Sequence, residues 1–235
     1  MIGVKIGVKI GEKHTYNDWG LILSNIIISP PVPQINMISV PLRDGSLDLT
    51  DSLTNDVKYN DRTITMTFSV VDPRSIWSTK ISEIANYLHG KRLKIIIDDD
   101  IAFYYVGRVN IDQWESDKRV GKIVIIGTVD PFKYDILSSA VDWEWDIFDF
   151  EDGIINEMGN LIVKGTRKIS LICRRKRMFP MFTADTAMTV TFEGETFNLS
   201  KGIQKMYDIF LCEGENELVF KGNGTVAIDY IGGSL

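Results

Sequence analysis

Three consecutive aspartates, Asp98 to Asp100, separate two apolar runs in LKIIIDDDIAFYYVGRV and form the densest group of one ionisable type in the chain. Such carboxylates could bind a hard cation. A cation site, however, needs oxygen ligands that converge from several elements, whereas neighbours on one turn diverge and repel one another. Aspartate also favours turns, because its side chain bonds nearby backbone. We predict a hairpin turn whose aspartates face water, with a cation site as the alternative.

The two histidines, His14 and His89, belong to no recognisable catalytic pattern. The chain has no G-x-S-x-G-like elbow and no H-E-x-x-H sequence. A hydrolase that combines the aspartates with a histidine is therefore a remote alternative, and we predict no enzyme. His89 ends a predicted helix, where a cation meets the negative end of the helix dipole, so we interpret it as a capping residue.

Trp143 and Trp145 flank Glu144 in the acidic stretch DWEWDIFDFED. These rings could stack on sugars while the carboxylates accept sugar hydroxyls, as in a carbohydrate-binding module. Residues at i and i+2 of a strand also share one face, which more often packs into a core or an interface. Sugar binding is therefore kept as the alternative function.

The tetrad RRKR, Arg174 to Arg177, resembles a nucleic-acid patch. The net charge of −6 and the pI near 5.0 argue against general phosphate neutralisation. Because the tetrad follows the strand-like run KISLIC, we predict a solvated loop or an interface with an acidic partner.

Length and composition indicate a folded globular protein with one large domain or two ordinary ones: 235 residues, 44% hydrophobic and 25% charged. Cys173 and Cys212 lack ligand spacing, so we predict small buried hydrophobes rather than a zinc site or a disulfide. The apolar stretch GLILSNIII is too short to cross a bilayer, and we read no secretory signal. We expect no metal or cofactor, no membrane insertion and synthesis in a cytoplasm.

The chain is predicted to be mainly β. Residues 62–70, RTITMTFSV, alternate strictly between apolar and polar side chains, which is typical of a half-buried strand. Similar runs recur at short intervals, so antiparallel sandwiches or barrels are favoured. A change of composition near residues 136–142 predicts two domains, residues 1–137 and 138–235, with the acidic excess in the second.

One segment is helical in pattern: we predict a helix over residues 73–89. Asp72 suits the N-cap, Pro73 suits the first position, and Gly90 suits the stop. Its apolar stripe implies that the helix covers one face of a sheet.

The order of motifs resembles one family. TYNDWGLIL is followed by SPPVPQINMISVPLRDGSLDLTDSL, VKYNDRTITMTFSV, the helix end IANYLHGK, the aspartate hairpin and GKIVIIGTVDPFKY. With LCEGENELVFKGNGTVAIDYIGGSL at the end, this set resembles, over the whole chain, the distal tail protein (Dit) of long, flexible-tailed bacteriophages. The family often has glycine where Leu42 stands. The resemblance implies an N-terminal β domain related to tail tubes, with one helix, and a C-terminal galectin-like β-sandwich without an insertion for gripping saccharide.

The resemblance also implies a mechanical role in the virion. Members form a hexameric ring at the tail tip, assembled in the host cytoplasm, through which DNA passes. The ring meets the tail-tube protein on one face and the tail-associated hub or lysin protein on the other, with tape-measure, baseplate or receptor-binding proteins as further neighbours. We expect Arg43, Asp44 and Asp48, in RDGSLDLTDSL, to make contacts around the ring.

Overall fold

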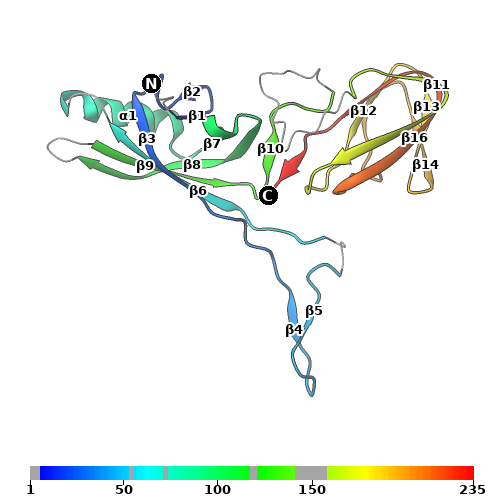
Figure 1. Cartoon of the computed structure of the whole chain (residues 1–235), viewed down its shortest axis with the longest axis horizontal. Helices are drawn as coiled ribbons and strands as arrows, with labels where there is room; N and C mark the ends of the chain where they lie inside the picture. The colour runs from blue at the N-terminus through cyan, green and yellow to red at the C-terminus, as the bar shows by residue number, and fades with distance from the viewer. Residues whose placement is uncertain (1–5, 53–55, 71–73, 117–120, 141–157) are drawn as a thin grey trace. The chain divides into compact units, whose positions relative to one another are not determined.

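The computed structural model describes residues 6–52, 56–70, 74–116, 121–140 and 158–235 (Figure 1). These fall into two compact units. Unit 1 comprises Met1–Asp100 and Tyr105–Pro131, and unit 2 comprises Ile101–Tyr104 and Phe132–Leu235. The described chain is mainly β with a single α-helix, which confirms the predicted fold class. The domain limits 1–137 and 138–235 stay a prediction.

Unit 1 is built on an antiparallel sheet whose strands run in the order β2-β1-β7-β8-β9-β6-β3. The strands are β1 (Val8–Ile10), β2 (Lys13–His14), β3 (Leu21–Ile28), β6 (Arg62–Val70), β7 (Lys91–Ile97), β8 (Phe103–Ser116) and β9 (Gly121–Val129). The predicted strand 62–70 is confirmed as β6, in which Ile64, Met66 and Phe68 are fully buried.

The helix α1 (Trp77–Leu88) lies over one face of this sheet and buries Trp77, Ile84 and Leu88 in its core (Figure 1). The helix ends at Leu88 with His89 as its C-cap, and Gly90 follows with φ +79°, so the predicted stop is confirmed. The helix begins later than predicted, because residues 74–76 form a 3-10 turn before it. Ile76 occupies the N-cap without a side-chain hydrogen bond, and the predicted cap at residues 72 and 73 lies outside the described residues.

Two single-residue bulges interrupt the sheet. Ser24 is the extra residue in β3 opposite β6, and its hydroxyl lies 2.7 Å from that of Ser69. Asp112 is the extra residue in β8 opposite β9. Thr67 pairs with Val124 between them, so the two bulges lie at nearly the same level of the sheet.

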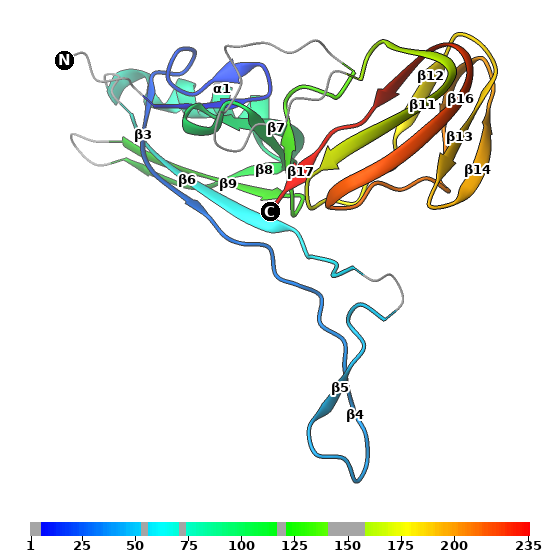
Figure 2. The ribbon, with the colours of Figure 1, turned by 45° about the vertical axis from the view of Figure 1, so that its right-hand side comes forward.

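Residues 29–61, hereafter the arm, leave the sheet after β3 and return into β6 (Figures 1 and 2). The arm begins as a continued ladder, in which the Gln34 N–H donates to the Lys58 carbonyl at 2.8 Å. Farther out it holds the two-stranded sheet of β4 (Met37–Ser39) and β5 (Ser46–Asp48). None of its described residues is buried, so the arm has no core of its own.

Unit 2 is organised around the long antiparallel pair β11 (Leu161–Cys173) and β16 (Gly214–Asp229). Residues 218–221 of β16 pair with β13 (Met188–Phe192), which pairs in turn with β14 (Glu195–Leu199). Residues 226–229 of β16 pair with β12 (Met181–Ala184), which pairs in turn with β15 (Gly202–Lys205). Phe182 and Phe220 are fully buried at the centre. The short strands β10 (Lys133–Asp135) and β17 (Gly233–Ser234) pair with each other.

Candidate functional site

The aspartate triplet forms the turn of a hairpin. Asp98–Asp100 adopt a 3-10 turn between β7 and β8, which pair in antiparallel fashion. The predicted hairpin is confirmed. Among the residues that the structure describes, no group of three histidines, cysteines or acids converges in a way that could hold a metal ion.

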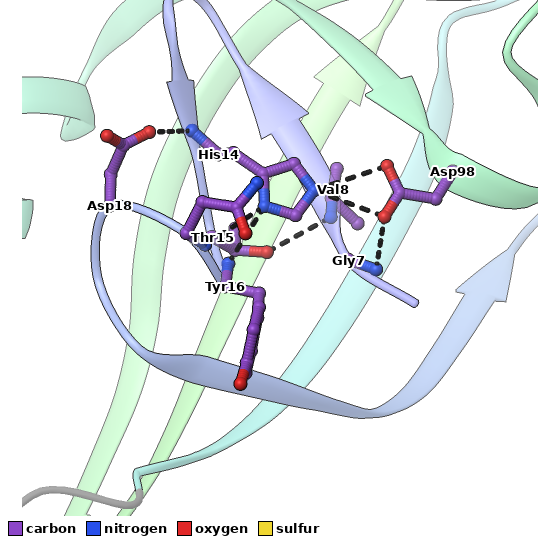
Figure 3. A network of polar contacts seen from close by, with 8 residues as sticks. Gly7, Val8, His14, Thr15, Tyr16, Asp18 and Asp98 are labelled. Carbon is purple, nitrogen blue, oxygen red and sulfur yellow. Dashed lines mark hydrogen bonds and ion pairs between the residues drawn. The ribbon is translucent and has the colours of Figure 1, made fainter. Parts of the chain in front are cut away.

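Asp98 does not simply face water, which corrects the prediction for this carboxylate. One of its oxygens accepts the Gly7 N–H at 2.7 Å and lies 3.1 Å from Nε2 of His14 (Figure 3). Asp98 therefore fastens the hairpin turn to the first strands of unit 1. Asp99 is the exposed member of the triplet.

The hydrogen bonds of His14 fix its tautomer. Nδ1 accepts two backbone N–H groups, those of Tyr16 at 3.2 Å and Asn17 at 3.1 Å (Figure 3). The ring proton must then lie on Nε2, where it is donated to Asp98. A general base needs a free lone pair, and this imidazole has none to offer. The His14–Asp98 pair holds the turn after β2 in place and is unsuited to proton abstraction.

His89 also uses its ring as an acceptor. Its Nδ1 accepts the Ile111 N–H at 3.1 Å, while its backbone N–H closes the helix on the Ala85 carbonyl. His89 is the C-cap of α1, which confirms the predicted capping position. Because an acceptor nitrogen carries no proton, its ring does not meet the helix end as a cation. His89 joins the end of α1 to β8 instead.

The tetrad Arg174–Arg177 lies in the loop between β11 and β12, so the predicted loop is confirmed, but its side chains contact other parts of unit 2 and are not simply solvated. An interface with an acidic partner stays a prediction. Arg174 bonds Asp135 at 2.9 Å and lies over the Phe103 ring, and Arg175 pairs with Glu213. Lys176 lies over Tyr134 and Arg177 over Phe210. Burial raises the pKa of Asp135 more than Arg174 lowers it. These cations tie several segments of unit 2 together.

The predicted sugar platform, Trp143 and Trp145, lies outside the described residues. Unit 2 has a groove of about 290 Å³ between the β13–β14 turn and the start of β16. Two of its carboxylates are engaged, Glu215 by Ser170 and Glu217 by Lys168, and its aromatic residue, Phe192, is buried. The groove therefore offers no exposed ring for stacking on a sugar.

Arg43, Asp44 and Asp48 all lie on the arm, at different levels of its β4–β5 hairpin. The Arg43 N–H closes a turn on the Val40 carbonyl. Asp48 accepts the backbone N–H and the hydroxyl of Thr50, and these hydrogen bonds lower its pKa. Asp48 thus shapes the end of β5, whereas Arg43 lies in the turn at the far end of the arm.

Sequence reasoning missed the arm's exposed apolar side chains. A free surface of such residues on a segment without a core is typical of a docking element. The only sequence feature that could have indicated this surface is the irregular spacing of apolar residues among the prolines of PPVPQINMISVP. The exposed apolar residues are Val32, Ile35, Met37, Ile38, Val40 and Leu42.

Leu42 is fully exposed and has φ +64°. It follows Pro41 in the turn closed by Arg43, at the position where a type II turn requires positive φ and favours glycine. Leucine in this conformation costs about 1 kcal/mol. Because strained backbone of this kind concentrates at functional sites, Leu42 is a candidate contact residue.

Replacing Leu42 by glycine should therefore strengthen the turn. We expect hydrogen exchange of the Arg43 amide to slow by about fivefold, because glycine adopts positive φ without strain. The control is Leu42→Ala, which removes the side chain but leaves the backbone conformation unfavourable and should not slow exchange. Faster exchange in the glycine variant would contradict this account.

No protein-family model and no curated protein matches the sequence. Solved structures do match. One is the crystal structure of the Dit protein (gp 19.1) of phage SPP1, described as a paradigm of the hub adsorption apparatus in phages that infect Gram-positive bacteria. The TM-score is 0.63 at 12% identity, over 96% of this chain and 98% of that chain. This similarity shows a Dit-like fold.

In the described part of the chain, no helix is long and apolar enough to span a membrane.

Proposed function

We propose that this protein is a structural component of a bacteriophage tail tip. Copies of it would form a ring that joins the tail tube to the adsorption apparatus and leaves a central channel for DNA. The observation that carries the proposal is the arm, which exposes apolar side chains and buries none of its described residues. Exposed apolar surface of this kind marks a site of contact with another protein surface. The Dit-like fold indicates which kind of assembly would supply that surface.

A second copy of the chain is the proposed cover. The last strand of the unit 1 sheet, β3, pairs with β6 on one side, and no partner strand is described on its other side. It is eight residues long and exposes Ile22, Ile27 and Ile28. A long apolar edge of this kind is a template for pairing with another chain. With the arm, it gives each copy two adjacent surfaces for its neighbours.

The proposed partners follow from this role. Besides further copies in a hexamer, they are the tail-tube protein, the tail-associated hub protein, and the tape-measure, baseplate or receptor-binding proteins. DNA is passing cargo. A mechanical role agrees with the polar groups of unit 1, where the imidazole of His14 has both ring nitrogens engaged and so has no free lone pair to act as a general base.

Native mass spectrometry over a range of protein concentrations tests the proposal, together with immunolabelling of purified tails. We expect a closed ring of six copies and label at one end of the tail. A protein that stays monomeric at every concentration and is missing from purified tails would contradict the proposal. A protein that is found in purified tails but forms only a one-to-one complex with a neighbouring tail protein would support the tail role and reject the ring.

A further inference from the structure

The strand β15 forms an open edge of unit 2. It pairs with β12 through Met181–Lys205, Phe182–Gln204, Thr183–Ile203 and Ala184–Gly202. Within the described residues it has no second strand partner, and it ends the order β14-β13-β16-β12-β15. Its outer edge therefore presents backbone N–H and C=O groups to which an extended chain could bond.

Exposed apolar side chains lie beside this edge. Ile203 is 71% exposed and Tyr207 is 68% exposed. Phe179 and Met181 are partly exposed next to them, and the Phe179 and Tyr207 ring centroids lie 5.7 Å apart. Apolar surface next to unpaired backbone is what a binding site for an added strand requires.

Lysines flank the edge. Lys201 immediately precedes β15, Lys205 ends it, and both side chains are exposed. Lys205 also lies over the Tyr207 ring, which places its charge beside the apolar cluster.

These charges decide which kind of strand fits. Pairing of β15 with β15 of a second copy would bring lysines together, whether the two strands ran parallel or antiparallel. Like charges opposite one another destabilise a strand pair. Lysines on an edge thus repel a second copy and basic segments, but they attract acids.

We propose that β15 is a docking edge for an extended, acidic segment of another protein. The segment adds a strand beside β15, sets an apolar side chain against Ile203 and Tyr207, and sets carboxylates against Lys201 and Lys205. This site concerns unit 2 alone and does not depend on ring formation through the arm.

Peptide binding to the full chain tests the proposal. The probe is a fluorescent nine-residue peptide of threonines with glutamates at positions 3 and 7 and valine at position 5. A second peptide carries lysines in place of the glutamates. We expect the glutamate peptide to bind at least about tenfold more tightly, because only its charges complement the edge. Amide signals of Ile203, Gln204 and Lys205 should shift on binding.

Charge reversal makes the test specific. The double variant Lys201→Glu and Lys205→Glu should invert the preference and bind the lysine peptide. Its control, Lys164→Glu and Lys221→Glu, changes the net charge equally at exposed positions on other strands and should keep the original preference. Thermal melting checks that both variants are folded.

Four outcomes would overturn the proposal. The first is equal binding of both peptides, and the second is a preference that does not follow the charge reversal. The third concerns two versions of the glutamate peptide, each N-methylated on the backbone amides of one of its two edges. One of these versions must lose its backbone hydrogen bonds to β15, so undiminished binding of both would contradict strand addition. Peptide binding that falls as protein concentration rises would assign the edge to a second copy instead, and would also reject the proposal.

Discussion

A variant with a shortened arm is expected to fold normally but to remain monomeric. Residues 35–57 would be replaced by Asn-Gly, a favourable hairpin turn, between Gln34 and Lys58, whose backbones already share a hydrogen bond. The change removes no residue that the structure shows to be buried, so the melting temperature should stay within about 4 °C. Light scattering after size-exclusion chromatography should show one copy of the variant under the conditions in which the full chain is expected to form the proposed ring.

Finer substitutions separate the two kinds of contact on the arm. Replacing Ile35, Met37 and Ile38 together by serine should weaken assembly more than replacing Arg43 and Asp44 by alanine, because the triple change removes exposed apolar area that the proposed contact would bury, whereas ion pairs at the exposed rim of an interface contribute little. Asp48→Ala should have an indirect effect through loss of the Thr50 hydrogen bonds. Normal assembly of the shortened variant would show that the arm is not the ring contact.

The largest loss of stability is expected from Gly107→Ala. A Cβ atom at position 107 would lie 2.1 Å from the Thr128 carbonyl oxygen and 2.4 Å from the Val129 Cα. Both atoms are backbone and belong to β9, so relief requires the β8–β9 pair to separate. We expect the free energy of unfolding to fall by about 3 kcal/mol or more, measured by urea denaturation.

Gly127→Ala is the matched control, since it changes a glycine in the same pair of strands. There the added Cβ would meet the end of the Ile95 side chain at 3.0 Å, which can shift. The expected loss is about 1 kcal/mol. Equal losses in the two variants would mean that the close backbone approach at Gly107 is not what limits stability.

The elements that could be predicted are those whose signals are local. Alternation over residues 62–70 comes from side chains that face the core in turn, and β6 follows it residue by residue. Gly90 marks the helix stop because the conformation after the last turn has positive φ. The aspartate hairpin was predictable for the same reason, since turn residues lie between two β-rich runs.

The contacts between distant segments could not be predicted. Nothing near Asp98 in the sequence indicates that His14, 84 positions away, is its partner. The run Arg174–Arg177 looks solvated until Phe103, Tyr134 and Asp135 are folded against it. The arm was missed because its apolar side chains pack into no core of this chain, so their spacing shows neither the strand nor the helix period. The Arg43, Asp44 and Asp48 contacts remain predictions.

The bulges at Ser24 and Asp112 have a geometric consequence. Each adds one residue to a strand whose neighbour gains none, and a strand with such an insertion bends and twists more strongly. Because the two insertions flank β6 and β9 at nearly one level, the local bends that they introduce fall on one line across the sheet, hereafter the crease. The crease is set by residue count, so substitutions that keep the length of β3 and β8 leave it in place. If copies of the chain assemble into a closed ring, the angle of this bend helps to set how many copies close it.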